Sequence, residues 1–262
     1  MEMRLGKTLV TQKHIVHCRE SEGISRALWI TSQSSFKDWK EDAAEEGLPF
    51  TDYQRLSRDK RRQALVELFK SDRFEISLIG HGTLQAEPLL AQMPWHHVTF
   101  DESVRIKNPQ AQITQTALRG FRAASHRVIL SGRPAPESEL EYFCQFAFQT
   151  GSFMGHRSYW GFRAEYFTPH AWKEHEWVPK PGAREVIAHA VSERAFVKLR
   201  SQVRSDEKLR DRRYVPQNAE QRRQEKQISS QMAFEAPDGV VTETNYAVVT
   251  TGWLRRVAGG FS

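Results

Sequence analysis

WHHVTFDESVRIKNP, residues 95–109, is the stretch that decides the fold of this chain. The apolar run at 97–100 predicts a short buried strand that leads directly into two adjacent carboxylates, Asp101 and Glu102. Asn108-Pro109 then predicts the N-cap and first residue of a helix. Acids at the carboxyl end of a buried parallel strand lie where open α/β sheets bind ligands. The pair is therefore a candidate catalytic site, although adjacent acids after a strand are also common as solvated loop residues.

Gly6-Lys7-Thr8, near the start of the chain, indicates a phosphate-binding loop. Such a loop holds phosphate oxygens with backbone N–H groups and a helix N-terminus. Lys7 would reach the β and γ phosphates, and Thr8 would ligate Mg²⁺ through its hydroxyl. The short motif also occurs by chance, and the complete motif has a further glycine where this chain has Met1. Together with Asp101 on Mg²⁺ and Glu102 on the attacking water, the loop predicts a nucleotide-hydrolysis site.

Short apolar runs alternate with longer amphipathic segments up to about residue 150. We predict strands at 27–31, 74–79, 97–100 and 127–130, and helices at 6–18, 35–46, 58–70, 109–122 and 137–148. Strands that alternate with helices imply parallel βαβ units. We therefore expect residues 1–150 to form an α/β lobe, a parallel sheet flanked by helices.

The composition changes after Thr150, where the chain becomes rich in aromatic residues, His and Gly and shows no clear hydrophobic periodicity. Helical patterns return at 184–190, 219–233 and 242–257, so we expect residues 151–262 to form a mostly helical extension. The aromatic residues between Tyr159 and Trp177 could stack nucleic-acid bases, but we favour a small separate core.

The composition is that of an ordinary globular protein with a basic balance. Of 262 residues, 39% are hydrophobic and 27% charged, which excludes a disordered chain. A net charge of +6 is compatible with a nucleic-acid partner. Basic residues are concentrated at 194–223, where they could track phosphates or simply form a solvated helix face; neither reading is preferred.

The sequence argues against a membrane protein and against a metal-stabilised fold. No apolar run approaches the roughly 20 residues that span a bilayer, and no signal peptide is apparent, so we expect a cytoplasmic protein of a bacterial or phage-infected cell. Cys18 and Cys144 lack CxxC spacing, so neither a disulfide framework nor a structural zinc site is predicted. We expect satisfied or surface roles rather than metal ligation for His96, His97, His156, His170 and His175.

Taken in order, these segments resemble the first motor lobe of the Swi/Snf-like double-stranded DNA translocases, within the superfamily-two helicases, with the phage-encoded members most similar. DESVRIKNP (101–109) resembles the DEAH-type motif with its RIKNP tail, and is the most specific match. Four further segments are similar to motifs of the family: EMRLGKTL (2–9), ALWITSQSSFKDW (27–39), IGHGTL (79–84) and VILSGRPAP (128–136). A weaker likeness continues through YWGFRAEYF to WLRRVAGGF.

The resemblance implies a RecA-like P-loop NTPase lobe that uses ATP and Mg²⁺ and contacts mainly the backbone of duplex DNA. It implies nucleotide binding by Gly6, Lys7, Thr8 and Leu9, and Mg²⁺ binding by Thr8 and Asp101. It makes Lys7, Asp101 and Glu102 catalytic. It also implies that Ser131, Gly132 and Arg133 couple the nucleotide state to DNA contact.

The chain departs from the family pattern at three positions: Arg4 replaces a glycine, Val104 a histidine and Arg133 a threonine. We find neither the first strand of the lobe nor any motif of the second lobe, whose arginine finger is worth roughly 10³ to 10⁵ in rate. We expect one lobe of a truncated or split motor, feebly active alone and completed by a second chain. The alternative is a non-catalytic nucleic-acid-binding remnant. A P-loop protein unrelated to DNA is disfavoured by the RIKNP and SGRPAP matches.

Overall fold

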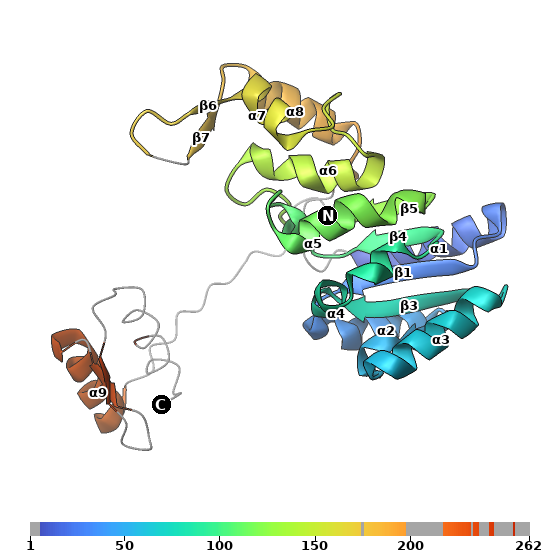
Figure 1. The fold of residues 1–262 in the computed structure, drawn as a ribbon. Helices are drawn as coiled ribbons and strands as arrows, with labels where there is room; N and C mark the ends of the chain where they lie inside the picture. The colour runs from blue at the N-terminus through green and yellow to red at the C-terminus, as the bar shows by residue number, and fades with distance from the viewer. Residues whose placement is uncertain are drawn as a thin grey trace, which may run out of the picture. The chain divides into compact units, whose positions relative to one another are not determined.

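The computed structural model describes residues 6–173, 176–197, 217–231, 233–235, 241–243 and 254. The chain divides into two compact units, Met1–Ser205 and Asp206–Ser262. The first unit is a parallel sheet with helices on both faces (Figure 1). The expected α/β class is confirmed.

The sheet has the strand order β2-β3-β1-β4-β5, and every pairing is parallel. Its strands are β1 (Arg26–Thr31), β2 (Phe50–Asp52), β3 (Glu75–Gly80), β4 (His97–Phe100) and β5 (His126–Ile129). Ile30 is paired with Phe100, and Phe100 with Ile129, so these strands end at the same edge. The predicted strands are confirmed within a residue or two. β2 was not predicted, because three half-buried residues carry no periodic signal.

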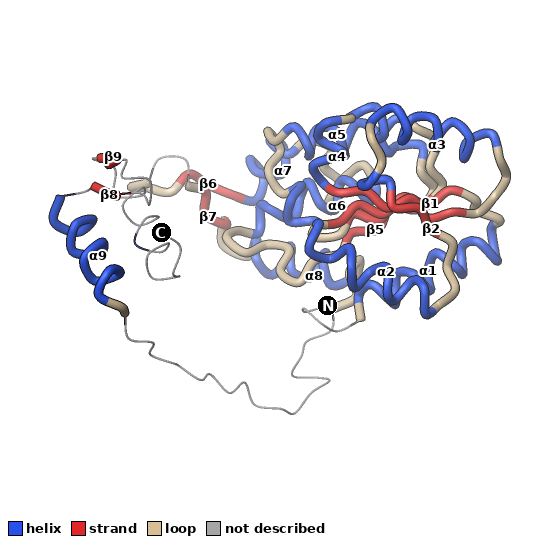
Figure 2. Tube along the Cα trace, turned by 90° about the horizontal axis from the view of Figure 1, so that it is seen from below, coloured by secondary structure: helices blue, strands red, loops and turns tan. Residues whose placement is uncertain are grey.

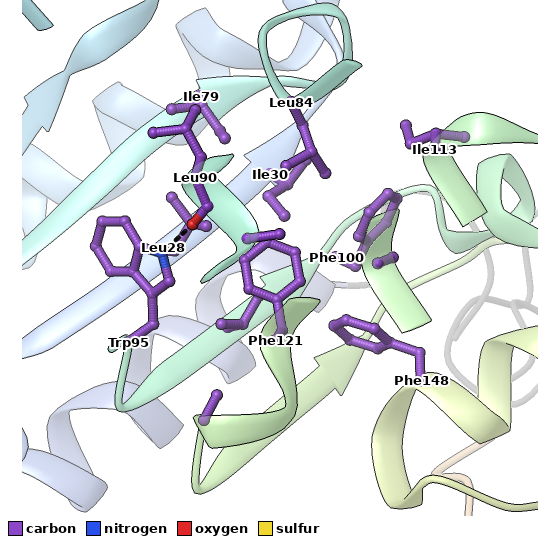
Figure 3. Packing of buried hydrophobic residues seen from close by; sticks show 14 of the residues in the cluster. Leu28, Ile30, Ile79, Leu84, Leu90, Trp95, Phe100, Ile113, Phe121 and Phe148 are labelled. Carbon is purple, nitrogen blue, oxygen red and sulfur yellow. Dashed lines mark hydrogen bonds between the residues drawn. The ribbon is translucent and has the colours of Figure 1, made fainter. Parts of the chain in front are cut away.

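Helices cover the two faces of the sheet unequally (Figure 2). On one face lie α1 (Lys7–Glu22) and α2 (Phe36–Glu45), and on the other α3 (Arg58–Lys70), α4 (His81–Ala86) and α5 (Gln112–Gly120). Successive residues of a strand point to opposite faces. Accordingly, Trp29 packs in the core beneath α1 and α2, whereas Leu28 and Ile30 pack in the other core with Phe100 and Trp95 (Figure 3).

The predicted helix start at Asn108-Pro109 is wrong. α5 begins at Gln112, and Ala111 occupies its N-cap position. Asn108 closes a turn instead: its Oδ1 accepts from the Gln110 amide at 2.9 Å, and its carbonyl accepts from the Ala111 amide at 3.2 Å. Asn side chains bond to nearby amides as readily in a turn as at a helix start, so the sequence does not distinguish the two.

The aromatic segment after residue 150 forms a second core with α6 (Tyr142–Thr150), α7 (Tyr159–Tyr166) and α8 (Ala183–Ser192). Phe146 of α6 stacks on Phe153 with ring centroids 4.8 Å apart, and Phe162 is fully buried beside them. The predicted small core is confirmed. Because α6 contributes to it, the boundary that we placed at residue 150 falls inside the first unit.

A hairpin of β6 (Phe167–Pro169) and β7 (Trp177–Pro179) projects from this core (Figure 1). In the second unit, α9 (Ala219–Gln231) confirms the helix predicted at 219–233, and β8 (Ala233–Glu235) pairs with β9 (Val241–Glu243). The helix predicted at 242–257 is wrong at its start, because 242 and 243 are strand residues. Most of that segment, and 198–216 of the basic stretch, lie outside the described residues. No described helix is long and apolar enough to cross a membrane.

Gly120 is needed where α5 meets the segment Pro88–Gln92. A Cβ on Gly120 would lie 2.3 Å from Ala91 Cβ and 2.8 Å from the Ala91 carbonyl oxygen, whereas a Cβ on Gly82 in α4 would meet nothing within 4 Å. We expect Gly120→Ala to lower the unfolding free energy by about 1–3 kcal/mol through overpacking. Gly82→Ala should leave it unchanged or raise it by up to about 1 kcal/mol. Denaturant unfolding of both variants tests this; equal effects would contradict the close approach.

Candidate functional site

The N-terminus of α1 has the features of an anion site. Gly6, at φ 75°, adopts the left-handed conformation that glycine accommodates without strain, and the helix begins at Lys7. Among the described residues, no side chain caps the first turn, and no acidic residue lies in it, so its N–H groups are available to a ligand. Helix N-termini of this kind bind phosphate.

Asp101 is held rigidly at the carboxyl end of β4. It is 8% exposed; its Oδ2 accepts from the Thr31 hydroxyl at 2.7 Å and its Oδ1 from the Glu102 amide at 2.9 Å. Its main-chain oxygen lies 2.8 Å from His81 Nε2, the first residue of α4. Burial lowers the pKa of His81, so a neutral imidazole donates this bond. Each carboxylate oxygen keeps a lone pair for a further partner.

Glu102 lies in a strained backbone conformation beside it. Its φ of 48° and ψ of 53° are left-handed, which costs a non-glycine residue about 1–3 kcal/mol. Burial raises the pKa of the Glu102 carboxyl group, and the Asp101 charge raises it further, while Lys7 and Arg105 oppose the shift. Lys7 is therefore within electrostatic reach of Glu102. The two adjacent carboxyl groups thus lie in different environments: hydrogen bonds fix Asp101, and burial beside Asp101 biases Glu102 toward binding a proton.

A buried glutamine joins this turn to the loop that follows β5. Gln145 of α6 accepts at Oε1 from the Ser103 hydroxyl at 2.7 Å. Its Nε2 donates to the Pro134 carbonyl at 2.7 Å and to the Glu141 carbonyl at 2.8 Å. The Ser103 amide also donates to the Leu130 carbonyl at 2.8 Å. Hydrogen bonds therefore connect the turn at 101–103 to the loop at 130–136.

That loop borders a cavity of about 580 Å³. Lys7 and Ser103 line it, as do the predicted coupling residues Ser131, Gly132 and Arg133. Arg133 is engaged within the loop: its amide donates to Ser131 Oγ at 3.2 Å, and its guanidinium donates to the Pro136 carbonyl at 3.2 Å. The structure thus brings Lys7, Glu102 and residues 131–133 to one region.

Five predicted site residues do not line this cavity: Gly6, Thr8, Leu9, Asp101 and Glu102. Thr8 is half-buried and Leu9 is 42% exposed. Conversely, Thr31, His81 and Gln145 were not identified as site residues from the sequence. Thr31 ends an apolar strand segment, and His81 directly follows another. We had matched both segments to motifs, so the position of these residues is the signal that could have identified them. Gln145 lies within an apolar helix, where a polar residue predicts a buried partner.

The comparisons with known proteins concern the family and the fold. A family model described as SNF2-related domain matches residues 1–199. A probable ATP-dependent DNA helicase of Arabidopsis thaliana is 27% identical over 144 residues, which is 53% of this chain and 13% of that protein. The transcription regulatory protein SNF2 of Saccharomyces cerevisiae is 27% identical over 135 residues, 51% of this chain and 8% of that protein. The match thus spans a small part of these relatives.

Two solved structures share the fold. The Sulfolobus solfataricus SWI2/SNF2 ATPase core in complex with dsDNA has a TM-score of 0.58 and 24% identity, covering 73% of this chain and 37% of that one. The ATPase core domain from the same organism has a TM-score of 0.55 and 18% identity, covering 98% and 51%. The sheet and its flanking helices therefore share the RecA-like fold of these SWI2/SNF2 ATPase cores.

Replacing Gln145 should loosen the link between turn and loop. Gln145→Leu keeps the volume but leaves the Ser103 hydroxyl and the Pro134 and Glu141 carbonyls without this partner. Each buried group left unsatisfied costs about 1–3 kcal/mol, so we expect a total loss of several kcal/mol in denaturant unfolding. Gln63→Leu, at an exposed position of α3, is the control. A loss no greater than that of the control would show that the bridge does not stabilise the fold.

Glu102→Gln should stabilise the protein. The raised pKa means that the ionised carboxylate is less favourable in the folded than in the unfolded chain. This penalty is absent below the unfolded pKa, grows between the unfolded and the folded pKa, and is complete above the folded pKa. We therefore expect a higher Tm for Glu102→Gln than for wild type at pH 8, and a smaller difference at pH 4. Glu67→Gln, at an exposed position of α3, should show no such trend.

Proposed function

Because the chain belongs to the family of SNF2-related domains, we propose that its first unit is the ATP-binding lobe of a Swi/Snf-like DNA translocase. The observation that carries the proposal is the meeting of Lys7, at the start of α1, with the Asp101-Glu102 turn at the end of β4. Lys7 moderates the Glu102 pKa and lines the cavity bordered by the loop after β5. An anion site and a carboxylate pair at one sheet edge suit nucleotide hydrolysis.

The α1 N-terminus would bind the ATP phosphates. The backbone N–H groups that follow Gly6 face an anion without competition from a capping side chain. Lys7 supplies a positive charge at the same place, suited to the β and γ phosphates. Thr8 and Leu9 continue the first turn, and we assign them to the nucleotide site by their place in it.

The donors present fit Mg²⁺, which prefers oxygen ligands. Asp101 offers a carboxylate whose orientation is fixed by Thr31, and Thr8 offers a hydroxyl; these two would hold the ion. When bound, the ion would neutralise charge that develops on the phosphate oxygens. Glu102 would accept the proton of the water that attacks the γ-phosphate in line. Its raised pKa makes it a stronger base, and implies that hydrolysis falls as the pH drops through that value.

Gln145 would couple this chemistry to DNA. It connects the turn at Ser103 to the loop that holds residues 131–133. A change in the phosphate site would thus shift the segment that we propose to contact the duplex. Support for duplex DNA as partner comes from the solved relative bound to dsDNA and from the net charge of +6.

We further propose that the lobe needs a second chain or lobe for rapid turnover, since a transition-state arginine is worth roughly 10³ to 10⁵ in rate. A non-catalytic nucleic-acid-binding remnant is the second candidate function. Arg4, Val104 and Arg133, where the motor pattern has glycine, histidine and threonine, favour it. A cytoplasmic location in a bacterial or phage-infected cell is part of the same proposal.

Phosphate release from Mg-ATP, with and without duplex DNA, tests the proposal. We expect weak hydrolysis that Lys7→Ala abolishes and that Glu102→Gln reduces by about 10²–10⁴, the usual contribution of a general base. Glu67→Gln should match the wild type. Glu102→Gln should still bind ATP, because the phosphate contacts remain.

If the chain is instead a non-catalytic nucleic-acid-binding remnant, we expect the opposite result. Under it, wild type and Lys7→Ala release phosphate equally slowly, and both bind duplex DNA with the same affinity and the same salt dependence. Strong turnover by the chain alone, stimulated by DNA, would instead contradict the need for a second lobe.

A further inference from the structure

Three imidazoles and a thiol converge toward the other end of α1, away from its phosphate-binding start. His14 and Cys18 lie one turn apart on α1 and so share a helix face. His97 and His126 are the first residues of β4 and β5 and pair with each other across the sheet. Their rings stack with centroids 5.8 Å apart, and the His14 ring lies 5.9 Å from that of His126.

The distances within this cluster suit a tetrahedral metal ion. One ligand atom each from His14, Cys18 and His126 lie within 4.8 Å of one another. Cys18 Sγ is 3.6 Å from His14 Nδ1 and 3.9 Å from its Nε2. With bonds of about 2.0–2.1 Å to nitrogen and 2.3 Å to sulfur, tetrahedral zinc places its N and S ligands roughly 3.6 Å apart. Small side-chain rotations would close the set.

The hydrogen bonds around the cluster leave the required lone pairs free. His126 Nε2 lies 2.8 Å from a Glu22 carboxylate oxygen and donates its proton there, which makes Nδ1 the ring atom that could bind a metal ion. His14 Nδ1 lies 3.2 Å from His97 Nε2; if it donates there, His14 Nε2 is the free ligand atom. Metal-binding histidines characteristically donate their other ring N–H to a carboxylate or similar acceptor, which fixes the ring. Glu22 and His97 occupy these supporting positions.

We propose that His14, Cys18 and His126 form a binding site for a divalent transition-metal ion, with Zn²⁺ as the best-matched occupant. Two nitrogens and one sulfur suit zinc and its neighbours, and do not suit Mg²⁺ or Ca²⁺, which prefer oxygen. The site is thus chemically distinct from the proposed Mg-ATP site. Three protein ligands leave a fourth position, which solvent can fill because His14 is exposed and lines the cavity.

The pKa shifts within the cluster act in opposite directions on metal binding. Partial burial, followed by the neighbouring His126, lowers the pKa of His14, which reduces competition by a proton. Burial raises the pKa of the Cys18 thiol, so the thiol holds its proton until a metal ion displaces it. Binding therefore releases a proton and tightens as the pH rises.

The ion would tie α1 to β5, two elements far apart in the sequence. Lys7 lies about two turns before His14 on the same helix, at 3.6 residues per turn. Occupancy would therefore fix the helix whose start we propose to bind phosphate. The metal site itself rests on the cluster alone and does not depend on the nucleotide site.

Titration of the metal-free full-length chain with Co²⁺, in buffer containing Mg²⁺, tests the site. We expect one equivalent per chain to produce a thiolate-to-cobalt charge-transfer band, which equimolar Zn²⁺ abolishes. His14→Gln and Cys18→Ala should lose the band or weaken binding at least about 100-fold. Glu22→Gln, which removes the carboxylate partner, should weaken it about 10–100-fold.

Matched controls separate ligation from general damage. His17→Gln changes another exposed histidine of α1, and Cys144→Ala removes the other thiol; both should keep the band. Zn²⁺ should raise the Tm of wild type and His17→Gln but not of His14→Gln. Because His14 is exposed, its variant is expected to fold, which circular dichroism checks. Absence of the band in wild type, or equal binding by His14→Gln and His17→Gln, would overturn the site.

Discussion

The buried hydrogen bond between Thr31 and Asp101 is the contact on which the site depends. Thr31 ends β1 and Asp101 follows β4, so the bond forms only when these strands pair in the register that sets Ile30 against Phe100. A slip by one residue would exchange the side chains of the two cores, placing Leu28 and Ile30 where Trp29 packs, and the mismatch in volume would disrupt both. Core packing thereby fixes the carboxylate. The strain at Glu102 persists because Asp101 and Ser103, on either side, are anchored by hydrogen bonds.

The second feature is a buried glutamine next to the site whose polar atoms are all paired with protein groups. Gln145 uses both of its side-chain polar atoms, toward the Ser103 hydroxyl and the Pro134 and Glu141 carbonyls. A fully satisfied buried network specifies one arrangement, because any alternative leaves a donor or acceptor unpaired in a medium of low dielectric constant. The loop after β5 is consequently held to the same framework as the carboxylates, although it lies at the surface of the sheet edge.

The sequence predicted the sheet well, and the roles assigned to the site residues stay predictions. Apolar runs such as 97–100 mark buried parallel strands, because burial on both faces demands continuous hydrophobicity. The helix start predicted at Asn108-Pro109 is wrong because an Asn side chain bonds to nearby backbone amides both in a turn and at a helix start. Thr31, His81 and Gln145 act through partners 70, 20 and 42 positions away, which no local pattern encodes. The cluster of His14, Cys18 and His126 was not identified from the sequence for the same reason, because only the fold brings β5 to α1.

α6 belongs to two cores at once. Phe148 faces Phe100 and Phe121 under the sheet, while Phe143 and Phe146 face the aromatic segment on the other side. A helix shared in this way cannot detach from one core without exposing large rings to water in the other. Opening of the segment 151–191 and opening of the sheet are therefore energetically linked, and amide hydrogens in both regions exchange with solvent as members of one cooperative unit. The aromatic segment is in this respect an integral layer of the lobe, and not an appendage that could be gained or lost on its own.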